Sequence, residues 1–564
     1  MKPIFLLVLG AWTVWAWAPC AQAQTVSSAP VVGEVRVGER LDVFDPKVPG
    51  EDWWPFRIAN KIHVTTREEV IRRELLLRPG DPWSELKALE SERNLRALGS
   101  FRYVEVRRAP RADGKVDLAV RTQDSWTTIP NLSIGTEGGQ SFFSYGIQEN
   151  NLFGYNKSVS FLHSQNGPDV RNDLRYTDPR LAGTRLRLSA LEATTGHGDS
   201  TGLDLARPFY ALDTPYAYGM GWTRFNDEDT LYQNAQTCSQ FLEYTRTTVL
   251  SAGHRLGSGE VLTQRLEAGW LYSKSRFTSE SGTLPGALPS DRELSGPILG
   301  YSWTQPRYSK ETYIDRMERV EDYNLGNELS FLGGYAGTHL GSDRDRWLFN
   351  VTDQQGLSLG EGRFALAQVG AAGRAAGEEW ENALLFTNLD LFWKNERPFL
   401  NTWVAHLEGA TVRRMDQENQ VVLGGATGLR GYENNAFTGA KAVLANVENR
   451  FFAPGEYLHL VRVGGAVFFD SGAVAPEGAG LSLRSFKSDV GAGLRLASTR
   501  SRSGGVVRVD LAYALDQGPG PTRWVLSVRG GQAFSIFNSA TRRLRRPPTS
   551  RLNEISPPGF PEAR

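Results

Sequence analysis

The chain has 564 residues, and its 63 basic and 63 acidic side chains leave a formal net charge of zero. A neutral chain argues against a general nucleic-acid binder, because such proteins carry an excess of basic residues. The 59 glycines and 11% aromatic residues, beside only 4 methionines and 2 cysteines, favour a β-rich protein. A mean hydropathy of −0.37 fits a soluble protein and also a transmembrane β-barrel, in which only alternate residues of each strand face lipid.

Residues 1–23 have the features of an export signal. Lys2 supplies a positive charge, residues 4–17 form an apolar run, and the stretch from Ala21 to Ala23 is a small-x-small cleavage site. The alternative is a membrane anchor, but the apolar run is shorter than the roughly 20 residues that a spanning helix needs. Cleavage after Ala23 leaves Cys238 as a lone cysteine, which cannot form an internal disulfide.

The next part of the chain predicts a linker and then a compact α+β unit. Residues 24–50 are rich in Pro, Val, Gly and Ser, which is typical of a linker. Within residues 51–124, Thr66 and Glu69 have the spacing of a capping box, and Pro82 after Asp81 suits the start of a helix. The expected elements are a strand over 57–64, helices over 66–75 and 81–99, and strands over 101–106 and 116–120.

Residues 125–538 predict a β-barrel. Short segments alternate between apolar and polar residues, as in Phe143, Tyr145 and Ile147, and Gly, Asp, Asn and Pro separate them. At roughly 25 residues per strand and connection, this region holds about sixteen strands, within the size range of transmembrane barrels. A soluble β-sandwich or propeller is the alternative, but no fixed period marks a propeller. Residues 539–564 are rich in Arg and Pro and predict a disordered basic tail.

Four motifs occur in order along the predicted barrel. They are GIQENNLFG at residues 146–154, LGGATGLRGY at 423–432 followed by NVENR at 446–450, VFFDSG at 467–472, and DVGAGLRL at 489–496. Together they resemble the BamA/TamA superfamily of outer-membrane protein insertases and translocases, which includes two-partner secretion transporters. The text LRPGDPWSELKALESERNLRALGSFRYVEV, at residues 77–106, resembles a polypeptide-transport-associated (POTRA) domain. An unrelated small α+β domain is the alternative for that unit.

The resemblance implies a fold that is mainly β: a transmembrane antiparallel barrel behind one periplasmic POTRA-like domain. In the family, the loop carrying the arginine folds back into the barrel, and the arginine meets an aspartate on a neighbouring strand. Here Arg430 matches that arginine and Asp470 the aspartate, with Glu448 as a second choice. The guanidinium group can bind a carboxylate through two hydrogen bonds, and inside a narrow lumen it needs such a partner. The alternative is an arginine on a surface loop. The loop residues of interest are Leu429, Arg430, Gly431 and Tyr432.

The junction between the first and last strands is the second candidate site. Pro130 lies near the start of the first strand, at 127–137, and proline is tolerated best at sheet edges. The last strand, at 522–537, contains two adjacent glycines. The resemblance implies a lateral gate in which an incoming strand pairs with the exposed first-strand edge; the alternative is that the glycines only relieve crowding. The expected gate residues are Pro130, Leu132, Ile134, Gly530 and Gly531. The last strand also resembles an outer-membrane β-signal, through Gly531, Phe534, Ile536 and Phe537.

We find no sequence pattern for a catalytic, cofactor or metal site, since the histidines are scattered and no phosphate-binding or nucleophile motif is present. The expected function is outer-membrane protein assembly or polypeptide translocation. A dedicated two-partner-type secretion transporter and a passive channel or structural barrel are the alternatives. The implied partners are unfolded outer-membrane or secreted polypeptides, outer-membrane lipids and accessory periplasmic proteins. The implied location is the outer membrane of a Gram-negative bacterium, with the POTRA-like domain and the tail in the periplasm.

Overall fold

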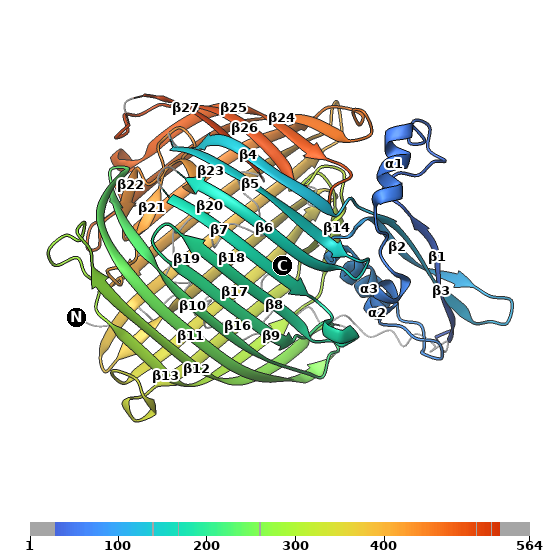
Figure 1. Cartoon of the computed structure of the whole chain (residues 1–564), viewed down its shortest axis with the longest axis horizontal. Coiled ribbons are helices and arrows are strands. Elements are labelled where there is room, and N and C mark those ends of the chain that lie inside the picture. The colour runs from blue at the N-terminus through green and yellow to red at the C-terminus, as the bar shows by residue number, and fades with distance from the viewer. Residues whose placement is uncertain are drawn as a thin grey trace.

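The computed structural model describes residues 29–137, 140–166, 169–258, 261–502, 505–520 and 522–530. A small N-terminal α+β unit lies against one end of a large closed barrel (Figure 1). The predicted fold class, mainly β with a small α+β region, is therefore confirmed. The expected signal peptide at 1–23, the β-signal residues Gly531, Phe534, Ile536 and Phe537, and the tail at 539–564 lie outside the described residues.

The N-terminal unit is a three-stranded sheet covered by helices. Its elements are β1 (Val32–Leu41), α1 (Trp54–Ile62), α2 (Glu68–Glu74), α3 (Glu85–Ala97), β2 (Phe101–Pro110) and β3 (Val116–Asp124). Strand β3 lies in the centre, parallel to β1 and antiparallel to β2. Ile71 of α2, Leu95 of α3 and Leu118 of β3 are fully buried between the helices and the sheet.

Two sequence-based predictions in this unit are wrong. The expected linker at 24–50 contains β1, and the expected strand at 57–64 is mostly helix α1. Ile58 and Ile62 lie four residues apart, a spacing that places them on one face of a strand and equally on one face of a helix. Pro55 in the first turn favours the helix, because its fixed φ suits a helix start. The predicted order of strand, helix, helix, strand, strand is present, with β1 as the first strand and α1 as an additional helix.

Both predicted helix starts are also shifted. Helix α2 begins after Arg67 without a side-chain cap, because the backbone N–H of Thr66 donates to Asp124 of β3 at 2.6 Å. Tertiary contact thus replaces the expected capping box. Helix α3 is capped by Ser84 instead of Asp81, and the Ser84 hydroxyl accepts from the backbone N–H of Lys87 at 3.3 Å.

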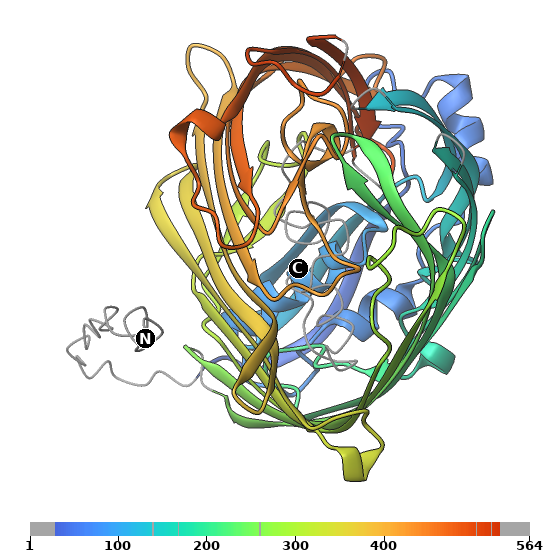
Figure 2. The ribbon, with the colours of Figure 1, turned by 90° about the vertical axis from the view of Figure 1, so that its left-hand side faces the viewer.

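The barrel is built from antiparallel strands that neighbour one another in chain order, and β27 closes it against β4 (Figure 2). Its strands are β4 (Thr128–Glu137), β5 (Gln140–Leu152), β6 (Lys157–Asn166), β7 (Asp169–Asp178), β8 (Arg187–Thr195), β9 (Asp199–Arg207), β10 (Tyr216–Gln233), β11 (Gln236–Ser258), β12 (Thr263–Ser279), β13 (Arg292–Thr304), β16 (Asn327–Ala336), β17 (Arg346–Gly360), β18 (Arg363–Ala376), β19 (Glu379–Asn395), β20 (Asn401–Arg413), β23 (Lys441–Phe452), β24 (Val461–Ala475), β25 (Lys487–Ser498), β26 (Val506–Ala514) and β27 (Trp524–Gly530).

Over the described residues the barrel therefore has twenty strands, and the predicted number of about sixteen is wrong. The estimate assumed long connections throughout. Several connections are tight turns instead, such as those between Gln233 and Gln236 and between Gly360 and Arg363. Dividing the length by an average repeat therefore undercounts the strands.

The outer wall of the barrel is apolar. Phe143, Tyr145 and Ile147 of β5, which alternate with polar residues, are 37%, 45% and 56% exposed on the outer side. Trp524 and Leu526 of β27 are exposed in the same way. An outward apolar band on alternate residues is the pattern of a barrel that faces lipid. Among the described helices, none has the length and apolar character needed to cross a membrane.

We call the barrel end beside the N-terminal unit the near rim and the opposite end the far rim. At the near rim, the connection between β13 and β16 carries the hairpin β14 (Tyr308–Glu311) and β15 (Glu321–Asn324). Ile314 and Tyr323 of this connection pack in one buried cluster with Phe364 and Phe392, on strands β18 and β19 of the barrel wall. Residues 305–326 thus enter the lumen from the near rim.

Charged contacts hold the N-terminal unit on this connection. Arg96 of α3 binds Asp322 through two hydrogen bonds of 2.8 and 2.6 Å. Glu92 on the same helix pairs with Lys310 at 2.6 Å. Two charged contacts from one helix fix the unit at the near rim, the barrel end beside which it lies in Figure 1.

A charge on the outer wall tests the lipid-facing assignment. Leu407 lies in the middle of β20 and is 44% exposed, so Leu407→Arg should lower the free energy of unfolding in lipid vesicles by about 2–4 kcal/mol. The matched control is Leu483→Arg, because Leu483 is 89% exposed in the connection between β24 and β25 and should change stability by less than about 0.5 kcal/mol. Equal effects in denaturant titrations of the two variants would contradict a lipid-facing wall.

Candidate functional site

The connection from β20 to β23, residues 414–440, folds back into the barrel from the far rim. It contains a small hairpin of β21 (Val421–Leu423) and β22 (Phe437–Gly439). In Figure 2 this orange segment lies inside the ring of strands. Val421 and Leu429 are fully buried, and the loop packs in one apolar cluster with Leu384, Ala410 and Leu444 of the wall. We call residues 414–440 the lumenal loop.

Two glycines allow this loop to approach the wall. Gly428 has φ +110°, a conformation that L side chains rarely adopt, and an added Cβ would lie 2.3 Å from a methyl carbon of Leu444. At Gly431 an added Cβ would lie 2.5 Å from the Cβ of Asp489 on β25. The Gly-Leu-Arg-Gly sequence therefore brings the arginine between them within reach of the wall.

Arg430 makes three charged hydrogen bonds inside the barrel. Its Nε donates to Asp470 Oδ2 at 2.7 Å, its Nη2 donates to Asp470 Oδ1 at 2.8 Å, and its Nη1 donates to Glu448 Oε2 at 2.5 Å. The guanidinium carbon also lies 3.4 Å from the centre of the Phe468 ring. Arg430 is 3% exposed, and the two carboxylates are fully buried. Asp470, the partner expected from the sequence, and Glu448, the second choice, thus both bind Arg430.

A wider set of buried charges surrounds this contact. Glu448 also pairs with Arg450 at 2.9 Å and with Arg495 at 3.5 Å. Asp510 of β26 pairs with Arg508 at 3.2 Å and with Arg495. Such groups are stable inside a protein only when each charge is matched, since removing one partner leaves an uncompensated buried charge. Arg430 is therefore one part of an ion network that spans β23 to β26.

Leu429 and Tyr432 fix the two sides of the arginine. Leu429 belongs to the buried apolar cluster. The Tyr432 hydroxyl donates to the carbonyl oxygen of Ser488 at 2.9 Å and lies 3.3 Å from that of Asp516. Its ring packs edge-on against Phe437 of β22 at 5.2 Å between centroids. The tyrosine thus joins the loop to the far ends of β25 and β26, close to the last strand.

Other contacts carry the loop across the lumen. Glu418 pairs with Arg292 of β13 at 2.8 Å, and Asp416 pairs with Arg374 of β18 at 2.6 Å. The side chain of Gln420 accepts from and donates to the backbone of Tyr232 at 2.8 and 2.9 Å. The loop is therefore attached to opposite parts of the wall.

Sequence reasoning missed most of this network, namely Arg292, Arg374, Arg450, Arg495, Arg508 and Asp510. A usable signal was present in the strands. Arg508 and Asp510 alternate with Val507, Val509 and Leu511, so both charged side chains share one face. In a barrel with an apolar outer wall, that face must be the lumen.

The structure describes the closing junction only in part. Pro130 lies opposite Ile147 of β5 in the register of β4 and β5, and Leu132 is 72% exposed. Strand β27 closes the barrel against β4. Gly530 is its last described residue, Gly531 lies outside the described residues, and nothing is described of the Ile134 side chain. The gate role of these positions stays a prediction.

Two titratable groups of the N-terminal unit have shifted pKa values. Burial raises the pKa of Asp124 to about 6, although a hydrogen bond from Thr66 opposes the shift. Burial lowers the pKa of His63, but the carboxylate of Asp42, 2.7 Å away, together with those of Asp124 and Glu149, raises it above its usual value. Across the described residues, no group of three or more His, Cys, Asp or Glu side chains could hold a metal ion.

No family model matches the chain. A segment of 128 residues, 22% of the chain, is 33% identical to the outer membrane protein assembly factor BamA of Neisseria meningitidis serogroup B, and it spans 16% of that relative. Among solved structures, CdiB from Acinetobacter baumannii aligns with a TM-score of 0.46 and 11% identity, over 89% of this chain and 74% of that one. CdiB from Escherichia coli aligns with a TM-score of 0.44 and 11% identity, over 92% of each chain.

A third solved structure, BamA from Haemophilus ducreyi lacking POTRA domains 1–3, aligns with a TM-score of 0.36 and 13% identity. It covers 89% of this chain and 84% of that one. At these scores, the structural likenesses say nothing about activity.

Loss of the arginine should release the lumenal loop. Arg430→Ala leaves Asp470 buried without this cation and removes one of the cations that Glu448 binds, at a cost of about 3–5 kcal/mol, so the loop should become accessible to proteinase K from the far rim. Arg414→Ala is the control, because that side chain is 57% exposed and pairs with Glu379, which is also exposed. Identical digestion patterns of the two variants in detergent would show that Arg430 does not hold the loop.

Proposed function

We propose that this chain belongs to the BamA/TamA-type superfamily of outer-membrane β-barrels and that it assembles or translocates other polypeptides at the outer membrane; the segment that is similar to BamA supports the proposal. The observation that carries the proposal is the lumenal loop, which is bound to the wall by Arg430, Asp470 and Glu448. These are the residues that the superfamily's motifs single out in this sequence. The matched relative is named as an assembly factor for outer-membrane proteins, and its clients give the class of partner that we propose here.

We place the N-terminal unit in the periplasm, where it would receive clients. Twenty strands are an even number, so the chain enters and leaves the barrel on the same side. The end of β27 then lies at the near rim, and the tail at 539–564 would share the periplasm with the unit. Strands β1 and β2 form the two edges of the small sheet over the described residues, and an extended client segment could add to either by backbone hydrogen bonds.

The lateral gate is the step that would let a client strand pair with the barrel. Each backbone hydrogen bond contributes roughly 0.5–1.5 kcal/mol net, and a client strand that pairs with β4 would form bonds of the same kind as those that β27 gives up. Tyr432 holds the far ends of the neighbouring strands β25 and β26. Opening would therefore separate β27 from β4, while the rest of the wall keeps its shape.

Two alternatives remain of interest. A dedicated secretion transporter would use the same gate and loop, and a neighbouring gene for a large secreted protein would favour it. A passive channel is disfavoured by the lumen, which residues 305–326 enter from the near rim and the lumenal loop enters from the far rim. Steady ion conductance of the purified protein in planar bilayers, without any client phenotype, would support the channel instead.

Arg430 should be needed for the activity and not for the barrel. Arg430→Ala is expected to lower the amount of client proteins in the outer membrane, measured by quantitative proteomics of cells that carry only the variant. Heat-modifiable migration of the variant itself should persist, because the strand pairings do not involve Arg430. Arg414→Ala is the matched control and should behave as wild type. A normal outer-membrane proteome in the Arg430 variant would refute a role for the loop.

Locking the closing junction should abolish activity. One cysteine is introduced among residues 128–132 of β4 and combined in turn with single cysteines along β27. Cys238 is replaced by serine, and each pair is then oxidised to a disulfide. The control is a disulfide between Val447→Cys and Phe469→Cys, which face each other on β23 and β24 and are both exposed on the outer wall. We expect loss of client insertion for the β4–β27 disulfide, recovery on reduction, and normal activity for the control. Full activity of the locked barrel would exclude lateral gating.

A further inference from the structure

Helix α1 exposes an apolar stripe that the N-terminal unit itself does not cover. Trp54, Ile58 and Ile62 follow one another at four-residue spacing and are 59%, 50% and 66% exposed. The opposite face is buried, because Phe56 stacks on Phe44 with ring centroids 4.2 Å apart. The helix therefore packs on the unit with one apolar face and presents a second apolar face outward.

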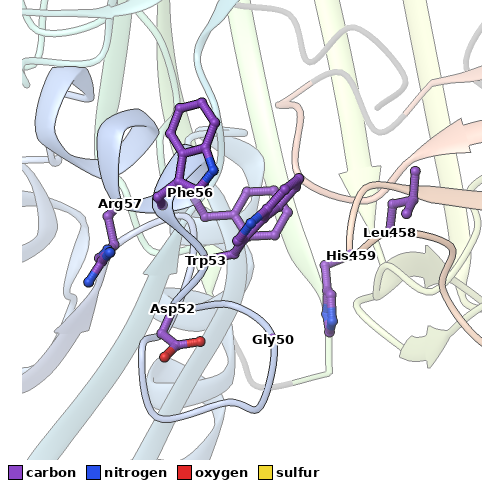
Figure 3. A pocket seen from close by; sticks show the side chains of 8 residues that line it. Gly50, Asp52, Trp53, Phe56, Arg57, Leu458 and His459 are labelled. Atoms are coloured by element: carbon purple, nitrogen blue, oxygen red, sulfur yellow. The ribbon is translucent and has the colours of Figure 1, made fainter.

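The barrel holds this helix at its near rim. Glu51, just before α1, binds Arg500 in the connection between β25 and β26 at 2.7 Å. Phe56 packs edge-on against His459 in the connection between β23 and β24, with ring centroids 6.3 Å apart (Figure 3). At the other end of the helix, His63 stacks on Trp126, two residues before β4. The outward face of α1 thus has a fixed position beside the strands that close the barrel.

The neighbouring connection extends the apolar surface. Tyr457 and Leu458, between β23 and β24, are 51% and 80% exposed. Between this connection and the start of α1 lies an open groove of about 530 Å³, lined by residues that include Trp53, Leu458 and His459 (Figure 3). On the strands that this connection joins, Phe451 and Val467 continue the exposed apolar surface up the outer wall. The surface of α1 and this connection is therefore continuous with the wall that faces lipid.

The charges of α1 suit a phospholipid headgroup region. Arg57 and Lys61 are exposed and flank the apolar stripe, whereas α1 itself carries no acidic residue. Asp52, which precedes the helix, is the acidic side chain that lines the groove. Tryptophan is enriched at membrane–water boundaries, and Trp53 and Trp54 stand at the start of the helix. An amphipathic helix with aromatic and aliphatic side chains on one face and cations beside them typically lies in the membrane interface.

We propose that α1 and residues 453–460 form an interfacial anchor that lies in the phospholipid leaflet at the near rim. The occupant of the exposed apolar face is then the lipid surface in which the barrel itself sits, and the cations meet the phosphate groups. This inference rests on the proposed position of the barrel in the membrane. It adds that the N-terminal unit is fixed to the leaflet next to the junction of β27 and β4.

Site-directed spin labelling tests the anchor in the whole protein. With Cys20 and Cys238 replaced by serine, single cysteines at Ile58 and Ile62 are labelled with a nitroxide, and the protein is reconstituted into vesicles of phosphatidylethanolamine and phosphatidylglycerol. Both sites are largely exposed, so the label does not disturb the core. We expect collisions with oxygen to exceed those with a water-soluble nickel complex several-fold, at a depth of about 5–10 Å below the headgroups.

Two reference sites separate failure of the anchor from failure of the membrane placement. Lys115→Cys, exposed in the turn between β2 and β3, reports a site in water, and Val467→Cys on β24 reports the outer wall. If the labels at 58 and 62 match the one at 115 while the one at 467 is in lipid, the anchor is wrong and the membrane placement stands. Labels in water at 58 and 62 are also the result expected if the exposed face of α1 binds another protein instead of lipid. If the label at 467 is also in water, the membrane placement fails, and the anchor fails with it.

Discussion

The buried contact of Arg430 with Asp470 and Glu448 is the constraint on which the arrangement of the lumen depends. A guanidinium group inside the barrel needs its charge matched, and both carboxylates come from adjacent wall strands, β23 and β24. The lumenal loop can satisfy that requirement only when Gly428 and Gly431 let its backbone approach the wall. One charged interaction therefore couples the loop conformation to the strands near the closing junction.

The two ends of the barrel are filled by different means. At the far rim, the lumenal loop is attached to opposite walls through ion pairs and a buried apolar cluster. At the near rim, residues 305–326 enter the lumen, and α3 binds them through Arg96 and Glu92. The N-terminal unit is thus fixed by charges to a segment that packs against the inner side of the barrel wall. Any displacement of the unit must break these contacts first.

The motifs predicted the barrel and the centre of the candidate site better than they predicted local secondary structure. Arg430, Asp470 and Glu448 were all named from the sequence, and all three meet in the structure. In contrast, the strand expected at 57–64 is helix α1, because Ile58 and Ile62 have a spacing that satisfies both periods. The capping box at Thr66 failed because the backbone of that residue binds Asp124, 58 positions away in the chain.

By itself the sequence determined the alternation of apolar and polar residues, and with it the outer wall, since a period of two is local information carried by each strand. The glycines at 428 and 431 also determine that the backbone on either side of Arg430 can approach the wall closely. Only the tertiary structure decided how many strands close the barrel, which arginines and carboxylates share the lumen, and that α1 turns an apolar face outward at the near rim. Those features depend on register and on contacts between residues hundreds of positions apart, and local patterns do not encode such distances.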